Sequence, residues 1–497
     1  MTDASLSTER ACAAIIGRLG PRSLVSGDAL AAVDPGWHPD NFASGVMALP
    51  ASTDEVAEIV RICAHEAVAI VPQGGRTGLV GGAISRAGEI VLSLQRMNAV
   101  LGVDPRERLA VVEAGATLHN LIEAAAAFGL EPGIDLPSRG NATLGGMAST
   151  NAGGIMAFRN GVMRHQVLGL EAVLPDGAVF RDLTRVVKVA AGYDLKQLLI
   201  GAEGTLGVIT RLVVKLEPKP AASATALFAL PSLRAALDAV ELGLRAGALR
   251  AAEFLGRRFL QLSAETQGFA DAAIDRTQPV FLLLALGGGE AASLRETLET
   301  LYGRLAELHA RAGGVIAQSE RQARDLWRLR EDTHTVYRAF PAAPSYDVSV
   351  PISEIEGYVS RVETETAALG FAPFIFGHLA DGNLHLIFDH AGPFEPAIAP
   401  RVEDVLYRGL GALGGSFSAE HGVGSKRIGS LQATADPVKL ALMATVKRAL
   451  DPKGLMNPGK LLAAPRGVSS LRQPLRQVDV DMVGDVVPGV VDADEQQ

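Results

Sequence analysis

The sequence predicts an α+β protein of two or three domains. Its 497 residues exceed the roughly 100 to 200 residues of one ordinary domain. Hydrophobic residues make up 48% of the chain, which supplies enough apolar surface for sizeable cores. Segments with the helical period alternate with short β runs along the whole length. The stretch 217–222, with Pro218 and Pro220, is the first expected domain boundary.

Composition excludes several classes of function. The net charge of -9 comes from 46 Lys and Arg against 55 Asp and Glu, and it disfavours a nucleic-acid partner. Cys12 and Cys63 are too few for a disulfide framework, an iron-sulfur cluster or a Cys-rich zinc site. A redox centre must therefore be an organic cofactor or a metal held by His and carboxylates. No apolar run reaches the ~18 residues of a membrane span, and the N-terminus lacks an export signal, so we expect a cytoplasmic location.

Residues 1–45 are expected to form a helical N-terminal segment, beginning with a short amphipathic helix. A first domain, 46–220, follows. Ser52 and Glu55 form a capping-box signature before apolar residues at helical spacing. Short strands are expected at 69–71 and 90–92, on either side of a Gly-rich connection. Further strands at 109–112, 169–174 and 208–216 and a helix at 118–128 complete this domain.

Residues 221–410 are expected to form a second domain that repeats strand and helix: 225–229, 233–245, 280–286 and 294–308. The last helix carries a leucine stripe predicted to be core, at Leu294, Leu298, Leu301, Leu305 and Leu308. A C-terminal segment, 411–465, contains a helix at 438–450 and a turn at 457–459. The acidic tail 466–497 is expected to be mobile, with an edge strand near 478–482 as the alternative.

Three Gly-rich segments lie in the first domain. The first, 73–82, has five glycines directly after an expected strand, and its free N–H groups can form a nest for phosphate oxygens. It lacks both the P-loop ending and the G-x-G-x-x-G spacing, which disfavours a nucleoside triphosphatase and a Rossmann dehydrogenase. A purely structural turn is the alternative. The segments 145–154 and 201–207 suggest that one long cofactor contacts all three.

With these segments, residues 50–460 resemble the flavoproteins of the vanillyl-alcohol oxidase type. The resemblance implies a two-part FAD-binding domain, an α+β cap domain and a C-terminal return to the FAD domain. It also implies non-covalent FAD, because Arg76 and Met147 stand where covalent members have His or Cys. The residues that the resemblance assigns to FAD are Pro72, Gly74, Gly75, Arg76, Thr77, Gly78, Ser138, Gly140, Thr143, Gly146, Ser149, Asn151, Gly153, Glu203, Gly207, Ile209 and Asn457.

A second constellation reads G-H-L-A-D-G-N-L-H from Gly377 to His385. Asp381-Gly382 is a turn signal between two apolar runs, which predicts a hairpin with His378 and His385 on either side of the turn. The two rings could converge on one metal, with Glu420 supplying a carboxylate. A His2Glu set with an open position suits catalytic zinc and, without a thiolate, equally manganese. Satisfied structural histidines are the alternative.

The family resemblance extends to the branch that oxidises D-2-hydroxy acids, in which G-H-x-x-D-G-N-x-H and E-H-G are characteristic. It implies that His378, His385 and Glu420 bind one divalent metal and that His421 is the catalytic base. The metal would stabilise the developing alkoxide, His421 would take the proton, and hydride would pass to flavin N5. Arg330, in L-W-R-L-R-E, matches the residue that binds the substrate carboxylate. An exposed helix charge is the alternative for Arg330.

Substrate-binding positions depart from the D-2-hydroxyglutarate pattern. That branch has Thr, Lys and Asn where this chain has His334, Ser345 and Ile387, and Asn383 is a further candidate. Losing these polar groups disfavours a second, buried carboxylate. The pattern resembles that of D-lactate dehydrogenases, so D-lactate or an acid with an apolar side chain is favoured. D-2-hydroxyglutarate stays an alternative because His334 could receive an anionic group.

Two rival functions remain at this point. One is a flavin-dependent alkylglycerone-phosphate synthase, and the other is the flavin subunit of a glycolate-oxidising membrane complex. For the favoured dehydrogenase the expected partners are a small 2-hydroxy acid and an external electron acceptor, such as an electron-transfer flavoprotein, a quinone or a cytochrome. The sequence leaves the acceptor and the oligomeric state open, a homodimer being one option.

Overall fold

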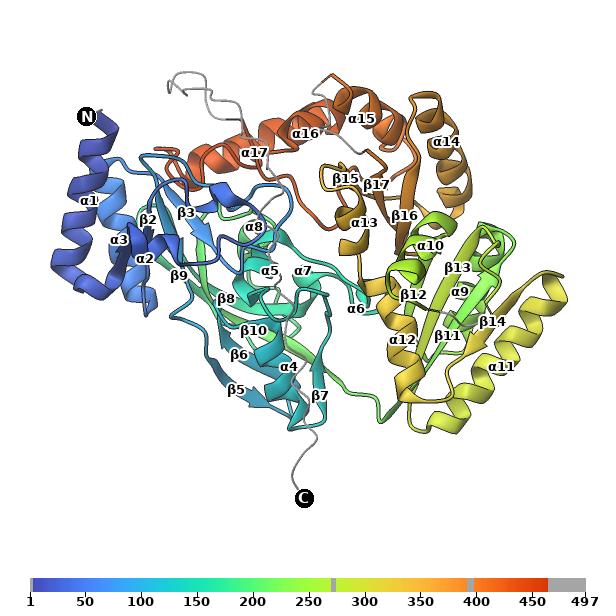
Figure 1. Ribbon diagram of the computed structural model, residues 1–497. Helices are drawn as coiled ribbons and strands as arrows, with labels where there is room; N and C mark the ends of the chain where they lie inside the picture. Colours follow the sequence, from blue (N-terminus) through green and yellow to red (C-terminus); the bar gives the residue numbers. More distant parts are fainter. Residues whose placement is uncertain (1–2, 270–273, 391–396, 464–497) are drawn as a thin grey trace.

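A computed structural model describes residues 3–269, 274–390 and 397–463. Three sheets and the helices around them form two lobes, with the N-terminal two sheets in one lobe and the third sheet in the other (Figure 1). The expected α+β class is confirmed. The acidic tail and its alternative edge strand lie outside the described residues.

The first sheet has the strand order β1-β2-β4-β3, formed by β1 (Leu24–Ser26), β2 (Val46–Ala48), β3 (Ile70–Gln73) and β4 (Ile90–Ser93). It is accompanied by α1 (Asp3–Leu19), η1 (Pro21–Ser23), α2 (Asp28–Ala31), η2 (Pro39–Phe42) and α3 (Thr53–Glu66). Residues 1–45 are thus not purely helical, because β1 pairs with β2 as an edge strand. The Ser52 hydroxyl caps α3 by accepting from the Glu55 N–H, as the sequence predicts.

The second sheet has the order β5-β6-β10-β8-β9, with β7 paired to β10. Its strands are β5 (Val100–Asp104), β6 (Leu109–Glu113), β7 (Leu130–Pro132), β8 (Val167–Val173), β9 (Val179–Asp182) and β10 (Val208–Pro218). The helices of this region are α4 (Leu118–Ala126), α5 (Leu144–Thr150), α6 (Ala157–Asn160), α7 (Met163–Gln166) and α8 (Lys196–Leu199). Every strand pair in this sheet is antiparallel.

The second Gly-rich segment begins as helix α5 and not as a loop. Thr143 caps this helix by accepting from the Gly146 N–H. Gly145 is required by packing, since a Cβ there would lie 2.6 Å from the Ala114 Cβ. The glycines therefore let the helix approach the second sheet closely.

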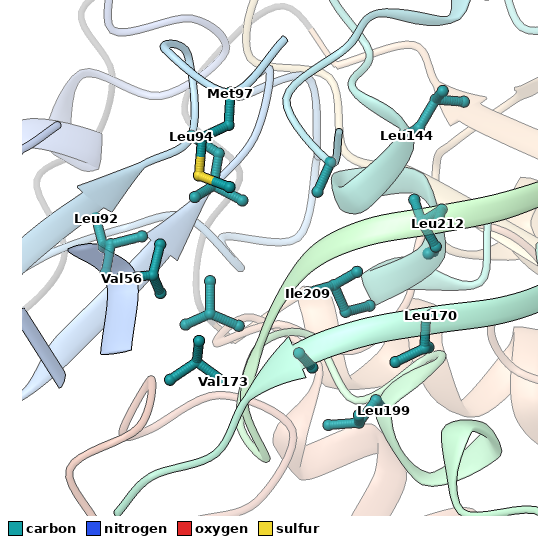
Figure 2. Close-up of a cluster of buried hydrophobic side chains, with 14 of the residues drawn as sticks. Val56, Leu92, Leu94, Met97, Leu144, Leu170, Val173, Leu199, Ile209 and Leu212 are labelled. Carbon is teal, nitrogen blue, oxygen red and sulfur yellow. The ribbon is translucent and has the colours of Figure 1, made fainter. Parts of the chain in front are cut away.

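One hydrophobic core joins the first two sheets. Figure 2 shows Val56 and Leu92 from the first sheet region beside Val173 and Ile209 of the second, and all four are buried. The apolar positions that gave α3 its helical period are the ones that fill this core. The first two sheets therefore share their packing, as two halves of one domain would.

The third sheet has the order β14-β11-β13-β12-β16-β17-β15. Its strands are β11 (Ala222–Leu230), β12 (Leu249–Gly256), β13 (Val280–Gly288), β14 (Gly313–Ile316), β15 (Ser345–Ser349), β16 (Pro373–His378) and β17 (Asn383–Phe388). One face packs against α9 (Leu233–Arg245), α11 (Ala291–Leu308), α14 (Ile355–Ala368) and α15 (Ala399–Tyr407), and the short η3 (Ile352–Glu354) precedes α14. The other face packs against α10 (Arg257–Thr266), α12 (Glu320–Glu331) and α13 (His334–Ala339).

The leucine stripe of α11 is buried as the sequence predicts, except for one residue. Leu294, Leu298, Leu301 and Leu305 are buried, whereas Leu308 is 63% exposed. Leu308 is the last residue of the helix and lies outside the apolar cluster that contains the other four.

The chain returns to the first sheet after leaving the third. Helices α16 (Ile428–Thr434) and α17 (Pro437–Leu450) lead to a bridge between Met456 and Ile70 of β3. The Asn457 N–H donates to the Ile70 carbonyl at 2.8 Å. In the parts of the chain that the structure describes, no helix combines the length and apolarity of a membrane span.

Candidate active site

The two histidines of the G-H-L-A-D-G-N-L-H motif lie on the expected hairpin of β16 and β17. His378 is the last residue of β16, and His385 faces Phe376 across the pair. Their ring centroids are 5.5 Å apart. Gly382 makes the tight turn possible because its φ is +77° and a Cβ would lie 2.0 Å from the Val350 carbonyl oxygen.

Glu420 lies opposite both rings, on the loop after Gly415. Its Oε1 is 3.8 Å from His378 Nε2, and its Oε2 is 3.9 Å from His385 Nε2. One ligand atom from each residue lies within 4.8 Å of the others. These distances are too long for hydrogen bonds but match two ligands that share one ion, since each ligand bond is ~2.0–2.2 Å. The donor set therefore fits a divalent metal.

Gly153 makes room for the Glu420 side chain. A Cβ at Gly153 would lie 2.7 Å from Glu420 Oε1. The Gly-rich segment 145–154 therefore borders Glu420 directly, which places backbone of the first domain beside the three possible ligands.

A buried carboxylate, Glu253 of β12, lies behind His378. It is fully buried, and its Oε1 is 2.8 Å from His378 Nδ1. Its Oε2 is 2.8 Å from Arg330 Nε. Burial raises the pKa of Glu253, but the positive charges of His378 and Arg330 outweigh this effect, so its pKa is lowered. Glu253 thus stays ionised and leaves His378 Nε2 facing Glu420.

The two hairpin histidines have opposite electrostatic environments. Burial lowers the pKa of His378, but the carboxylates of Glu253 and Glu420 raise it to about 9. Burial, with the positive charge of His378, holds the pKa of His385 well below its ordinary value. Without a metal, then, the His378 ring is a cation with both nitrogens protonated at neutral pH, and the His385 ring is neutral.

Arg330 is not the exposed helix charge that the sequence allowed as an alternative. It is 5% exposed, near the end of α12, with its guanidinium 5.1 Å from the Phe376 ring. Its Nε faces Glu253, as described above. The charge of Arg330 is therefore held beside the hairpin, between Glu253 and the Phe376 ring.

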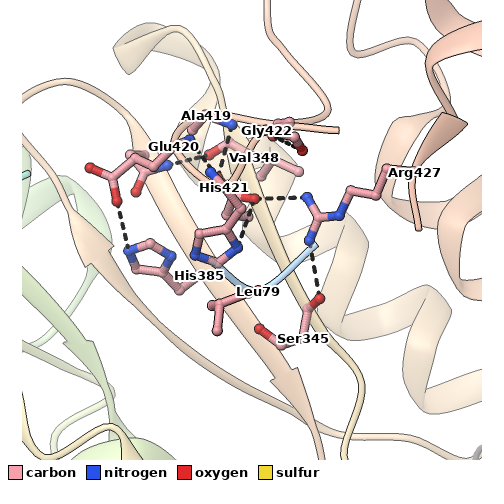
Figure 3. A network of polar contacts seen from close by, with 12 residues as sticks. Leu79, Ser345, Val348, His385, Ala419, Glu420, His421, Gly422 and Arg427 are labelled. Atoms are coloured by element: carbon pink, nitrogen blue, oxygen red, sulfur yellow. Dashed lines mark hydrogen bonds and ion pairs between the residues drawn. The ribbon is translucent and has the colours of Figure 1, made fainter. Parts of the chain in front are cut away.

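His421 stands next to Glu420 and stacks on His385, with ring centroids 5.6 Å apart and planes 18° from parallel. Its Nδ1 lies 3.1 Å from Oδ1 of Asp347, which is fully buried on β15. The same Oδ1 accepts from Arg427 Nη1 at 2.8 Å (Figure 3). Burial raises the pKa of Asp347, but His421 and Arg427 lower it well below its usual range.

The loop that carries Glu420 and His421 is held by two carboxylates, one on β15 of the third sheet and one in the turn between α8 and β10. Asp347 Oδ2 accepts the N–H groups of Ala419, Glu420 and His421 at 2.9, 2.7 and 3.2 Å. Glu203, which follows the second sheet's α8, accepts from Val423 and Gly424, both at 2.7 Å. The side chain of Glu203 therefore binds the C-terminal loop.

The candidate substrate-binding residues differ in burial and in their polar contacts. Ser345 pairs with Ile387 across β15 and β17, two residues from Asp347 and His385 respectively. Ile387 is 2% exposed, inside an apolar cluster with Phe374 and Phe376. Ser345 receives a hydrogen bond at its carbonyl from Arg427. These positions supply no positive charge of their own.

His334 and Asn383 complete that group. His334 is exposed on α13, with its ring 5.7 Å from the Trp37 ring. Asn383 is buried and donates to the Val348 carbonyl. Among the described residues, its Oδ1 has no hydrogen-bond partner.

A cavity of about 240 Å³ lies at the first Gly-rich segment. Five of the residues assigned to FAD line it: Gly74, Gly75, Arg76, Gly140 and Thr143. A Cβ at Gly78 or Gly140 would meet no atom within 4 Å. Within the described ranges, the buried Arg76 Nε has no partner. Open backbone beside an arginine nitrogen that has no partner fits the phosphate-containing part of a cofactor such as FAD.

The other residues assigned to FAD lie on or next to the three Gly-rich segments and the elements that follow them. Gly146, Ser149 and Asn151 lie on or beside α5, and Gly207 and Ile209 lead into β10. Asn457 donates to the carbonyls of Gly82 and Glu203, so it links the first and third Gly-rich segments. Pro72 packs near Gly204, and Thr77 and Ser138 lie on the connecting loops. The three Gly-rich segments are thus neighbours in space.

Sequence reasoning missed Glu253, Asp347 and Arg427. A weak signal was present, because each carboxylate interrupts an apolar strand, A-A-E-F-L and Y-D-V-S. Carboxylates are rarely fully buried unless they are paired. Their partners come from elements far away in the sequence, so only the fold identifies them.

Two family models match the chain. "FAD binding domain" matches residues 45–183, and "FAD linked oxidases, C-terminal domain" matches residues 219–461. Solved structures share the fold at 18% identity: p-cresol methylhydroxylase has a TM-score of 0.73 over 91% of this chain and 96% of its own, and alkyldihydroxyacetonephosphate synthase has 0.69 over 90% and 85%.

Relatives with assigned names are more similar in sequence. D-2-hydroxyglutarate dehydrogenase of Xanthomonas citri pv. viticola is 36% identical over 86% of this chain and 90% of its own. The mitochondrial D-2-hydroxyglutarate dehydrogenase of Arabidopsis thaliana is 34% identical over 89% of this chain and 80% of its own. An uncharacterized FAD-linked oxidoreductase of Mycobacterium tuberculosis is 35% identical over 83% and 89%.

Proposed function

The chain belongs to the FAD-linked oxidoreductases of the vanillyl-alcohol oxidase type, in their D-2-hydroxy acid dehydrogenase family, and from this premise we propose that it oxidises a D-2-hydroxy acid to the 2-oxo acid. The observation that carries the proposal is the convergence of His378, His385 and Glu420 with His421 and Arg330 at one point. That grouping supplies a metal site, a base and a carboxylate anchor together.

Each side chain has a separate task in this proposal. Arg330 binds the substrate carboxylate through the donors that Glu253 does not occupy. His421 accepts the proton of the C2 hydroxyl at Nε2, since Nδ1 faces Asp347. When bound, FAD would accept the hydride from C2, and a divalent ion held by His378, His385 and Glu420 would stabilise the developing alkoxide. Zinc and manganese both suit the donor set.

The favoured substrate has a small or apolar side chain, such as D-lactate. Ser345 and Ile387 offer no cation for a second carboxylate, and Ile387 lies in an apolar cluster. A buried, unpaired carboxylate would cost several kcal/mol.

D-2-hydroxyglutarate is the second candidate, supported by the names of the relatives at 33–36% identity. His334 is the nearby group that could receive its second carboxylate, as the sequence suggested. The resemblance to the synthase at 18% identity concerns the fold and does not favour a transferase.

Anaerobic mixing tests the proposal. The purified flavoprotein should be bleached by D-2-hydroxy acids and not by their L enantiomers, and a soluble dye should then restore the flavin colour. Treatment with a chelator should stop bleaching while the flavin spectrum remains, and added zinc or manganese should restore it. Unchanged bleaching in protein shown by elemental analysis to be metal-free would contradict the metal's role.

The same assay separates the substrates. The rate constants for D-lactate and D-2-hydroxyglutarate are measured side by side, with glycolate as a third acid. A clear preference for D-2-hydroxyglutarate would overturn the interpretation of Ser345 and Ile387. Absence of bleaching by every D-2-hydroxy acid would overturn the proposed reaction.

A further inference from the structure

Asp347 makes five contacts that all concern the loop of the proposed base. Its Oδ2 accepts three successive N–H groups at 2.9, 2.7 and 3.2 Å, from Ala419 to His421. Its Oδ1 lies 3.1 Å from His421 Nδ1 and 2.8 Å from Arg427 Nη1. Both oxygens of the carboxylate are occupied by these partners, and the side chain is fully buried. A substrate cannot reach it.

The two oxygens of Asp347 do different things. The Oδ2 bonds fix the backbone of the turn, and with it the positions from which the side chains of Glu420 and His421 leave the chain. The Oδ1 atom faces the His421 ring and also accepts from Arg427 Nη1. A carboxylate oxygen can only accept, so the ring nitrogen that faces it must carry the hydrogen. In a neutral ring the other nitrogen, Nε2, then has the free lone pair.

We propose that Asp347 is a positioning residue that fixes His421 in the Nδ1–H tautomer, so that Nε2 is the atom that takes the substrate's hydroxyl proton. The proposal rests on the proposed function for the identity of that proton, but the tautomer itself does not depend on turnover. Glu253 and His378 form a similar contact on the other side of the centre, at 2.8 Å. There the other ring nitrogen, Nε2, faces Glu420.

The contacts of Asp347 with His421 and Arg427 explain why a carboxylate is needed rather than any polar group. In the variant Asp347→Asn, the amide oxygen can replace Oδ2 and keep the three backbone hydrogen bonds. The amide nitrogen then occupies the place of Oδ1 and donates hydrogen toward His421 Nδ1. The His421 ring must then change to the Nε2–H tautomer, in which Nε2 has no lone pair for the substrate proton.

The first measurement is the tautomer itself. Protein with ¹⁵N-labelled histidine is examined by NMR at alkaline pH, where histidine rings are neutral, and the His421 signals are identified by their loss in His421→Ala. We expect the hydrogen on Nδ1 in the unaltered protein and on Nε2 in Asp347→Asn. A hydrogen on Nε2 in the unaltered protein overturns the proposal whatever the activity is.

A matched control exists in Glu203. Like Asp347, it is a buried carboxylate that accepts N–H groups of the same loop, from Val423 and Gly424, but neither of these contacts involves a histidine ring. Glu203→Gln should therefore leave the His421 tautomer unchanged. If Glu203→Gln shifts the tautomer as Asp347→Asn does, loop disturbance is the cause and the proposal fails.

The kinetic measurement uses a double-mutant cycle. Asp347→Asn should slow flavin reduction by on the order of 10²–10⁴-fold, with the apparent dissociation constant of the acid changed only a few-fold. The double variant Asp347→Asn/His421→Ala should be no slower than His421→Ala alone, because both act through the same ring. Independent, multiplying losses would mean that Asp347 has a merely structural role.

Loss of the Asp347 charge leaves Arg427 without its ion-pair partner, so folding needs a check. FAD content and the unfolding transition are measured for each variant. If Asp347→Asn does not fold, the NMR and kinetic measurements are repeated on the charge-balanced variant Asp347→Asn/Arg427→Gln. If the unaltered protein bleaches with no D-2-hydroxy acid, the proposed function fails, and the NMR result still decides the tautomer.

Discussion

At the residue scale, two buried carboxylates determine which ring nitrogens face the candidate centre. Glu253 does so for His378, and Asp347 does so for His421. Both acids are fully buried, and each also contacts an arginine: Arg330 for Glu253 and Arg427 for Asp347. Each side of the centre therefore balances a negative charge with a guanidinium and a ring. Removing one partner of such a set costs roughly 3–5 kcal/mol, since the others remain buried and unpaired.

Metal binding should release a proton from His378. The metal-free protein holds that proton below pH 9, because carboxylates overcome the effect of burial and raise the pKa to about 9. A metal needs the lone pair of Nε2, so about one proton should leave per ion from this residue near pH 7. Apparent affinity should then rise about tenfold per pH unit as the pH increases toward 9. Calorimetry of zinc binding in buffers of different ionisation enthalpy measures this; binding without proton release would contradict it.

A lysine at position 345 should increase activity on a dicarboxylate. Ser345 lies at the edge strand β15, and a new cation there can pair with a second carboxylate. We expect Ser345→Lys to raise kcat/KM for D-2-hydroxyglutarate relative to D-lactate by about tenfold, as one charge-assisted hydrogen bond provides. Ser345→Met, similar in length and uncharged, is the control. An equal ratio in both variants would count against this position.

The companion change Ile387→Asn is a poorer test than the sequence suggested. Ile387 is 2% exposed between Phe374 and Phe376, so an amide there would be buried without partners. It should destabilise the protein by about 1–3 kcal/mol. Its effect on substrate choice would be mixed with that loss.

At the scale of elements, the β16–β17 hairpin brings His378 and His385 together. The residues between them, Leu379 to Leu384, include a turn that only a glycine at 382 can form without a clash. The hairpin also lies between β12 and β15, the strands that supply Glu253 and Asp347. Four chemically important side chains thus come from adjacent strands of one sheet.

Replacing Gly382 by alanine should disrupt this hairpin. Its φ of +77° is unfavourable for alanine, and the new Cβ would lie 2.0 Å from the Val350 carbonyl oxygen. Gly370→Ala is the control, since Gly370 has φ +86° but open space around it. The control should lose about 1–2 kcal/mol of unfolding free energy. Gly382→Ala should lose more and bind zinc more weakly; equal losses in denaturant titrations, with zinc affinity unchanged, would refute the hairpin's role.

At the scale of the whole molecule, the C-terminal segment joins the two lobes at the candidate centre. Its loop is held by Asp347 from the third sheet and by Glu203 from the second sheet's region. After α17 the chain bridges to Ile70 on the first sheet. The proposed base and one proposed metal ligand therefore occupy a segment that all three sheets position.

The cavity at the first Gly-rich segment provides a test of FAD placement. Gly140 lines it, and a side chain there would meet no protein atom within 4 Å. Gly140→Val should fold normally but contain much less FAD, whereas Gly102→Val, also in open space but on β5, should keep its FAD. The ratio of flavin to protein absorbance measures this. A fully flavin-loaded Gly140→Val variant would remove this cavity from the FAD site.

Gly75 is less suitable for that test than the sequence implied. A Cβ at Gly75 would lie 1.8 Å from the Asn141 carbonyl oxygen. Gly75→Val would therefore separate two loops of the protein, and loss of FAD would follow from misfolding as readily as from a blocked cofactor site.

The sequence by itself determined the α+β class, the hairpin around Asp381-Gly382, the helix that begins after Ser52 and the helix at 233–245. These follow from local causes: a turn residue that accepts a positive φ, a capping hydroxyl at Ser52, and apolar residues repeated at 3.6-residue spacing. Motifs such as G-H-L-A-D-G-N-L-H also identified the candidate metal and base residues, since their chemistry is concentrated in a few neighbouring positions.

Only the tertiary structure decided what surrounds those residues. It showed that Arg330 is buried against Glu253, that Asp347 holds His421, that α5 is a helix despite its glycines, and that Leu308 is exposed. The physical reason is distance along the chain. Glu253 and His378 are 125 residues apart, and Glu203 and Val423 are 220 apart. Pairing across such separations depends on which strands become neighbours in the folded sheets, and periodicity within a short window carries no information about that.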